Sequence, residues 1–179
     1  QDVEDANHIS FNDTKWNVIS IPHTWNAIDG ANGNEFHRGA CWYRKIVSLP
    51  EEDTGNRVFI EFQGANSVTD VFLNGKHLGQ HRGGYSSFRF DLTENFVFGE
   101  SNALAVKVDN SAFEDVYPLR ADFTFYGGIY RDVNLIVVNP VHVDLLDHGS
   151  SGVYVVHEEV SDEQAKLRLR TRISNHLTQ

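Results

Sequence analysis

Along most of the chain, apolar and polar side chains alternate over short runs, and this period of two constrains the fold more than any other feature. Residues 57–63, 68–73 and 103–109 are rich in β-branched and aromatic side chains, as is typical of strands half buried in a sheet. Further strands are expected at 42–49, 88–92, 129–138, 141–146, 153–157 and 165–174. No segment shows a sustained helical period. The sequence therefore predicts an all-β fold, and the many short strands favour a β-sandwich.

The clearest turn signal is Asn74-Gly75, which follows the strand pattern at 68–73. A type I′ turn needs a positive φ at both central residues, and Asn and Gly tolerate that conformation best. Residues 76–80 can then return as the partner strand. This segment also contains His77 and His81, whose spacing suits metal ligands on a helix, but a strand pattern with Gly79 places them on a surface hairpin instead.

Composition excludes several classes of partner. The chain has 179 residues, 40% of them hydrophobic, which is enough to bury a core. Its net charge of -10 would repel phosphate backbones and anionic lipid, so neither nucleic acid nor a membrane is an expected partner. Cys41 is the only cysteine, which removes an internal disulfide and a thiolate zinc site. No cofactor is expected, and the oligomeric state is left open.

A domain boundary is expected at Asn139-Pro140. Pro140 lacks the N–H that a strand ladder needs, so it should end the strand at 129–138. The roughly forty residues that follow are too few for a core of their own. We therefore expect a first domain over residues 1–138 and the incomplete beginning of a second sandwich over residues 139–179. The alternative is one larger sandwich that includes these last strands.

Five motifs occur in an order that matches a known family. They are Ser20-Ile21-Pro22-His23-Thr24-Trp25, Gly39-Ala40-Cys41-Trp42-Tyr43-Arg44-Lys45, Val71-Phe72-Leu73-Asn74-Gly75-Lys76, Ser87-Phe88-Arg89-Phe90-Asp91-Leu92-Thr93 and Gly127-Gly128-Ile129-Tyr130-Arg131-Asp132-Val133. Together they resemble the N-terminal sugar-binding domain of family 2 glycoside hydrolases, most of all a bacterial β-galactosidase. β-Glucuronidases and β-mannosidases belong to the same family.

This resemblance implies a fold and a function. The fold is a galactose-binding-like jelly roll followed by the start of an immunoglobulin-like domain. The parent protein would be a glycoside hydrolase whose acid and nucleophile lie on a catalytic barrel absent from these 179 residues, so this chain alone is expected to be inactive and to hold no catalytic residue. Its partners would be a β-galactoside-like carbohydrate and that barrel. The alternative is a free-standing carbohydrate-binding or assembly module, because fold does not fix function.

The resemblance also implies three substrate-binding residues. Asp122 lies seven positions before Ile129, as in the family's loop that contacts sugar hydroxyls, and a carboxylate accepts charge-assisted hydrogen bonds from such groups. Asn34 and Arg38 occupy a second loop near the substrate in β-galactosidases. An ordinary solvated loop acid is the alternative for Asp122. A cation beside Asp122 in the full-length parent is also left open, whereas no metal site is expected within this chain itself.

Overall fold

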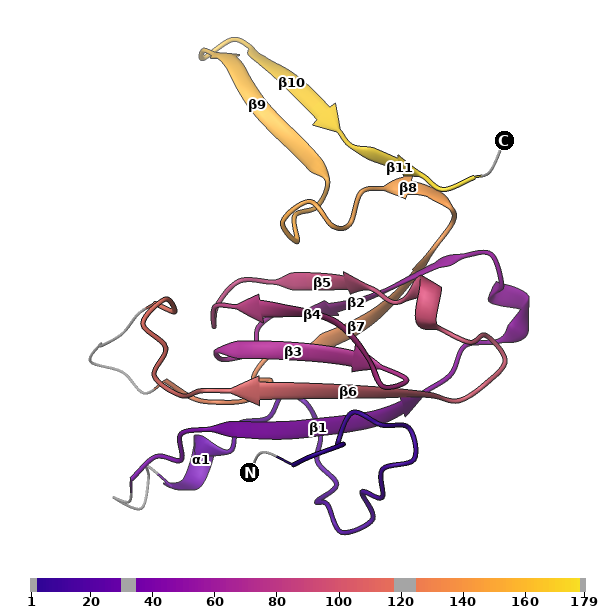
Figure 1. Ribbon diagram of the computed structural model, residues 1–179. Coiled ribbons are helices and arrows are strands. Elements are labelled where there is room, and N and C mark those ends of the chain that lie inside the picture. The colour runs from indigo at the N-terminus through magenta and orange to yellow at the C-terminus, as the bar shows by residue number, and fades with distance from the viewer. Residues whose placement is uncertain (1–2, 30–34, 118–124, 178–179) are drawn as a thin grey trace.

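Two antiparallel sheets form the first part of the molecule. The computed structural model describes residues 3–29, 35–117 and 125–177 (Figure 1). One sheet has the strand order β1 (Ala40–Val47), β6 (Asn102–Asp109), β3 (Val68–Leu73) and β4 (Lys76–Arg82). The other has the order β5 (Phe88–Asp91), β2 (Arg57–Phe62) and β7 (Val133–Val138). The predicted all-β class is confirmed.

The core lies between these two sheets. β2 contributes Val58, Ile60 and Phe62, all at most 1% exposed, at every second position. The opposite sheet contributes Val71, Leu73, Leu104, Val106 and Val108 to the same cluster. Alternation places these side chains on one face of each strand. Phe59 and Phe62 are both buried, but Phe59 points to the other face of its sheet, where it contacts His142 with ring centroids 5.4 Å apart.

The predicted hairpin at Asn74-Gly75 joins β3 to β4. Asn74 has φ 51° and Gly75 has φ 86°, as a type I′ turn requires. The Asn74 side chain also accepts a hydrogen bond from the N–H of Ala103, which ties the turn to β6 at 2.8 Å. His77 and His81 both lie on β4, and the expected surface hairpin is confirmed.

Helices are short in the described part of the chain. They are α1 (Asn26–Asp29) and two 3₁₀ turns, η1 (Glu51–Asp53) and η2 (Thr93–Asn95). Within those same residues, no helix has the length and apolar composition that crossing a bilayer requires.

The strands after Pro140 pair only with one another among the described residues. β8 (Val141–Val143) pairs with β11 (Ile173–Asn175), and β9 (Val153–Val160) pairs with β10 (Ala165–Thr171). Figure 1 shows the β9–β10 hairpin extending away from the two sheets. This pairing supports a boundary near residue 139, although the division into domains 1–138 and 139–179 remains a prediction.

Several strand limits differ from the sequence-based expectation, among them those of β7, β8 and β10. β7 begins at Val133 rather than 129, and just before this segment Gly128 forms an isolated antiparallel bridge with Asn66. β8 ends at Val143, after which the Asp144 carboxylate accepts a hydrogen bond from the N–H of Leu146 in a turn. The strand expected at 165–174 is broken at Arg172, where the chain changes from β9 to β8 as its partner.

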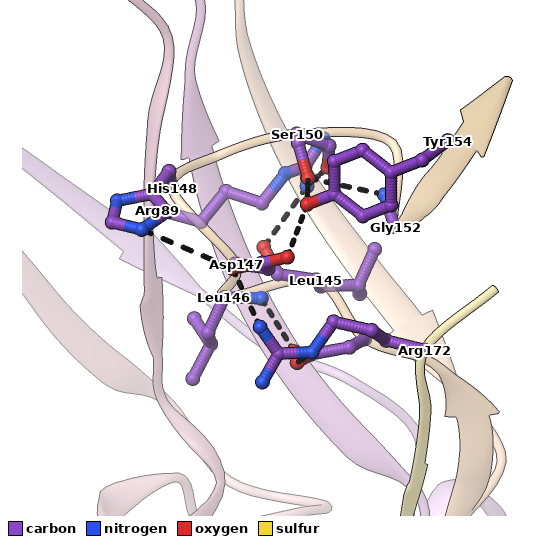
Figure 2. Close-up of polar contacts among 10 residues, drawn as sticks. Arg89, Leu145, Leu146, Asp147, His148, Ser150, Gly152, Tyr154 and Arg172 are labelled. Atoms are coloured by element: carbon purple, nitrogen blue, oxygen red, sulfur yellow. Dashed lines mark hydrogen bonds and ion pairs between the residues drawn. The ribbon is translucent and has the colours of Figure 1, made fainter. Parts of the chain in front are cut away.

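Polar contacts connect the jelly-roll sheet to the segment that follows it (Figure 2). Arg89 Nη1 donates to the carbonyl oxygens of Leu145, at 2.9 Å, and Ser150, at 2.7 Å. The same guanidinium forms an ion pair with Glu61, with 2.6 Å between Nη2 and Oε1. Beyond it, Asp147 accepts hydrogen bonds from Tyr154 and Arg172, which lower its pKa. The first turn after β8 is therefore fixed both to β5 and to β9.

Candidate functional site

Two loops meet at one end of the sandwich, and a pair of buried asparagines holds them together. Asn26 and Asn110 are each 1% exposed, and Asn110 Nδ2 donates to Asn26 Oδ1 at 3.2 Å. Asn26 Nδ2 donates to Asp29 and to the carbonyl oxygen of His37, at 2.8 and 3.2 Å. Asn110 Oδ1 accepts from the N–H of Gly39 at 2.9 Å. Asn26 thus binds both ends of the segment from residue 29 to residue 39, and Asn110 binds its second end.

The second loop, which returns to the sandwich at Gly127, is attached to the same pair. The N–H of Gly127 donates to Asn26 Oδ1 at 2.7 Å, and its carbonyl oxygen accepts from Thr24 Oγ1 at 2.8 Å. A Cβ at Gly127 would lie 2.2 Å from the Trp25 ring and 2.5 Å from Asn110 Nδ2. Glycine is therefore required here for close approach.

Gly128 is required for a different reason. Its φ is +122°, a conformation that side chains with a Cβ resist. Its N–H and carbonyl oxygen both bond to the backbone of Asn66, at 3.3 and 3.0 Å. Asn66 Nδ2 also donates to the carbonyl oxygen of Tyr126 at 3.0 Å. The returning loop is thus fixed on both sides.

Aromatic and titratable side chains surround this network. The Trp25 ring packs against the core, and its Nε1 faces the carbonyl oxygen of His37 at 3.4 Å. His23 Nδ1 lies 2.9 Å from the Tyr43 hydroxyl. Burial lowers the pKa of His23 and raises those of Tyr43 and the Cys41 thiol. At neutral pH these groups are therefore uncharged and stabilise the sandwich end by packing and hydrogen bonding.

Arg38 connects the two loops directly. Its Nη1 donates to the carbonyl oxygen of Asn110 at 3.2 Å, and its guanidinium carbon lies 5.7 Å from the centre of the Phe125 ring. The residue is exposed. Of the three predicted substrate-binding residues, Arg38 is the one that the structure describes; Asn34 and Asp122 lie outside the described residues. Substrate binding by all three remains a prediction.

The described residues on both sides of Asp122 are fixed. On the N-terminal side, Arg82 forms a two-pronged ion pair with Asp115, at 2.6 and 2.7 Å, and its guanidinium stacks on Phe113. On the C-terminal side, Tyr126 and Gly127 are held by Asn66 and Asn26. The loop that carries Asp122 therefore starts and ends at the same end of the sandwich as the loop that carries Asn34.

Two of the described carboxylates at this end, Asp29 and Asp115, are engaged by neighbouring groups. Asp29 accepts hydrogen bonds from Asn26 and the N–H of His37, and Asp115 pairs with Arg82. Within residues 3–29, 35–117 and 125–177, no cluster of three or more His, Cys, Asp or Glu side chains could hold a metal ion. What the described residues show at this end is that the segments flanking both loops are held by polar contacts.

Sequence reasoning missed the asparagine pair. Asn26 follows the motif that ends at Trp25, and Asn110 follows the strand pattern at 103–109. An asparagine directly after a strand usually indicates a turn. Its burial next to another asparagine 84 positions away has no sequence signal.

Comparisons with known proteins agree with this architecture. Residues 8–139 match the family model described as glycosyl hydrolases family 2, sugar binding domain. A β-glucuronidase of Bacteroides fragilis is 44% identical over 158 residues, which are 88% of this chain and 23% of that protein. A β-galactosidase of Thermoanaerobacter pseudethanolicus is 33% identical over 178 residues, which are 97% of this chain and 23% of that protein.

A solved structure has the same fold over nearly the whole chain. Bacteroides uniformis β-glucuronidase 2, covalently bound to cyclophellitol-6-carboxylate aziridine, is 39% identical with a TM-score of 0.92. The match covers 97% of this chain and 20% of that one. The chain thus spans about a fifth to a quarter of the relatives it matches. By the extent of the family match and by these identities, the chain belongs to family 2 of the glycosyl hydrolases, as the sugar-binding domain and the residues that follow it.

Proposed function

We propose that this chain is the N-terminal, non-catalytic part of a family 2 glycoside hydrolase, and that its two loops form one wall of the parent's substrate site. The observation that carries this proposal is the Asn26–Asn110 pair, which fixes the ends of both loops at one end of the sandwich. A rigid scaffold is what a substrate-positioning loop needs, because small displacements of a binding group cost much of its effect.

In this proposal Asp122 accepts hydrogen bonds from sugar hydroxyls, and Asn34 and Arg38 contribute from the second loop. The acid and the nucleophile belong to another part of the parent protein. Retaining hydrolysis needs two carboxyl groups about 5 Å apart. Among the described acids near the loops, Asp115 is paired with Arg82 and Asp29 with the amide of Asn26.

The β-glucuronides are the first substrates to test, with β-galactosides second. The relatives named β-glucuronidase reach 44% and 39% identity, whereas the β-galactosidase of T. pseudethanolicus reaches 33%. The sequence motifs alone favoured a β-galactosidase.

The competing proposal is a free-standing carbohydrate-binding module. The two proposals differ in glycan binding by the isolated chain. A free-standing module would bind glycan by itself, and it would have no parent activity that a substitution could alter. We expect residues 1–179 alone to show no turnover of aryl β-glucuronides or β-galactosides. Turnover lost on replacing Asp122 in that isolated chain would contradict our proposal.

The decisive variant is Asp122→Asn in the complete enzyme. Loss of a charge-assisted hydrogen bond costs roughly 1.5–3 kcal/mol, so kcat/KM should fall about ten- to a hundredfold. The melting temperature should stay within about 2 °C, since replacing a loop acid without buried partners usually changes stability by less than about 0.5 kcal/mol. Asp162→Asn, in the exposed turn between β9 and β10, is the matched control and should leave both quantities unchanged. An unchanged kcat/KM in the Asp122 variant would mean that Asp122 is an ordinary solvated loop acid and does not bind the substrate.

A further inference from the structure

The sandwich is open along one side, between the edge strands β1 and β7. A cavity of about 1110 Å³ lies there. Its floor consists of core residues of β2 and β6, namely Ile60, Phe62, Leu104 and Val106, all at most 8% exposed. The cavity is therefore an opening into the main hydrophobic core rather than a depression on a polar surface.

Strand register identifies side chains that point inward but are exposed. Leu135 pairs with Ile60, and paired residues of adjacent strands lie on the same face, so Leu135 points to the core side of β7. It is nevertheless 37% exposed. On the opposite rim, Lys45 pairs with the core residue Leu104 and is also exposed. Inward-facing positions on both edges thus lack a covering layer among the described residues.

The rim adds further apolar surface and free backbone edges. Val18, Ile19 and Ile21 line the same cavity and are 101%, 41% and 42% exposed. Within the described residues, β1 pairs only with β6 and β7 pairs only with β2. Each strand therefore has one edge with which no other strand pairs among the described residues. Apolar area that stays in water forfeits about 25 cal/mol per Å² of stabilisation.

We propose that this cleft is filled in the parent protein by an extended strand of the same polypeptide that lies outside residues 1–179. The strand would pair with β1 or β7 over about six to eight residues, the lengths of those strands. Alternate side chains of the strand would be apolar and would cover Leu135, Ile60 and Phe62.

Two observations favour the same polypeptide over a separate partner. The relatives are four to five times longer than the matched region, since it covers 19–23% of the first three of them, so polypeptide is available within one chain. Val3, the first described residue, lines the cavity, so a segment joined on that side would reach it through a short connection. The proposal does not depend on which glycoside the parent hydrolyses, because its tests measure accessibility and hydrogen exchange.

The first test labels a thiol in the complete protein. Leu135→Cys places a probe on the inward face of β7, and Ile46→Cys places one on the outward face of β1, where Ile46 is 55% exposed and does not line the cavity. We expect a maleimide to react at position 135 at least about a hundredfold more slowly than in the urea-unfolded protein. Peptide mass spectrometry separates this thiol from Cys41 and any others. Less than hundredfold protection at position 135 would overturn the proposal. Ile46→Cys shows how much protection a β-strand gives without a covering strand.

The second test uses the unmodified protein. In an edge strand, alternate amides point at the free edge and exchange with solvent, whereas a strand with two neighbours protects both sets. We expect both sets of amides to exchange slowly in β1 or in β7. Protection of only alternate amides in both strands would mean that no strand has been added. Protection that is lost when the protein is diluted to a monomer would assign the cleft to a second copy and would equally overturn the proposal.

Discussion

The side chains of Asn26 and Asn110, 84 positions apart in the chain, form a hydrogen bond inside the sandwich and between them bind the ends of both loops. Neither amide is exposed, and each has a partner for its oxygen and its nitrogen. Buried amides with complete partners specify a single arrangement, because any other arrangement leaves a polar group unpaired. The pair therefore fixes the positions of the loop ends relative to the sandwich for as long as the sandwich is folded.

Replacing Asn110 with alanine should destabilise the protein and weaken substrate binding in the parent. The N–H of Gly39 and the Oδ1 of Asn26 would each lose a buried partner. We expect a loss of roughly 2–4 kcal/mol in unfolding free energy. Urea unfolding and the KM for an aryl glycoside are the two measurements.

Asn134→Ala is the matched control for that variant. Asn134 is exposed, and its side chain donates a hydrogen bond to Glu61 at 3.1 Å. A change within about 0.5 kcal/mol is expected there. Equal effects of the two alanine substitutions would show that the buried pair has no special role.

The fold could be predicted largely from local patterns. The period of two at 57–63 and 68–73 and the turn at Asn74-Gly75 depend on neighbouring residues alone, and the observed β2, β3 and β4 follow them closely. The start of β7 could not be predicted in this way. The run from Ile129 to Val138 looks like one strand, yet its first residues belong to the loop that Asn66 holds.

Alanine substitutions at Gly127 and Gly55 distinguish the cost of a steric contact from the cost of backbone strain. Gly127→Ala should place a methyl group within 2.2 Å of the Trp25 ring, at a position where φ itself imposes no penalty. Gly55→Ala adds a methyl group with nothing within 4 Å, but at φ +97°. We expect Gly127→Ala to lose about 3 kcal/mol or more and Gly55→Ala about 1 kcal/mol. Thermal melting of both variants measures this difference. A larger loss for Gly55→Ala than for Gly127→Ala would mean that the segment at Gly127 moves away from Trp25 with little loss of stability.

The candidate site shows why long-range contacts escape sequence reasoning. Arg38 was predicted from its loop position, but its contacts with Asn110 and Phe125 depend on residues 72 and 87 positions away. The need for glycine at 127 follows from the position of Trp25, which the sequence places 102 residues earlier. Such contacts can be identified only from the folded structure, because the packing of the sheets determines how close the two loops lie.

The ion pair at the junction should make stability depend on pH. Burial alone would raise the pKa of Glu61, but hydrogen bonds from Arg89 and Asn134 and the charge of Arg89 outweigh it, so the pKa lies below its usual value. A lowered pKa means that stability is present above about pH 4.3, the usual value for glutamate, and is lost as the pH falls through the lower value of the folded state. Glu61→Gln should therefore be less stable than the wild type at pH 7, and the gap should narrow below pH 4.

Urea unfolding at several pH values measures the difference in stability between Glu61→Gln and the wild type. Amide exchange of β2 is a second measurement of the same difference. Glu159→Gln, on the exposed strand β9, provides the control and should show no such convergence. A gap of equal size at pH 7 and pH 3.5 would mean that the charge of Glu61 contributes nothing.

Arg89→Lys should loosen the connection between the jelly roll and the strands after Pro140, even though the charge is kept. A lysine has one ammonium group, whereas the planar guanidinium of Arg89 reaches Glu61 and two carbonyl oxygens at once. Because its side chain is 11% exposed, breaking this set should cost about 3 kcal/mol locally. Amide exchange of residues 144–152 should accelerate, with little change in the core strand β6. Arg168→Lys, at an arginine whose side chain is 73% exposed and paired with Glu158, should leave exchange at 144–152 unchanged. If Arg89→Lys also left it unchanged, the backbone bonds of Asp144 and Gly152 to Arg172 would be sufficient to hold the turn.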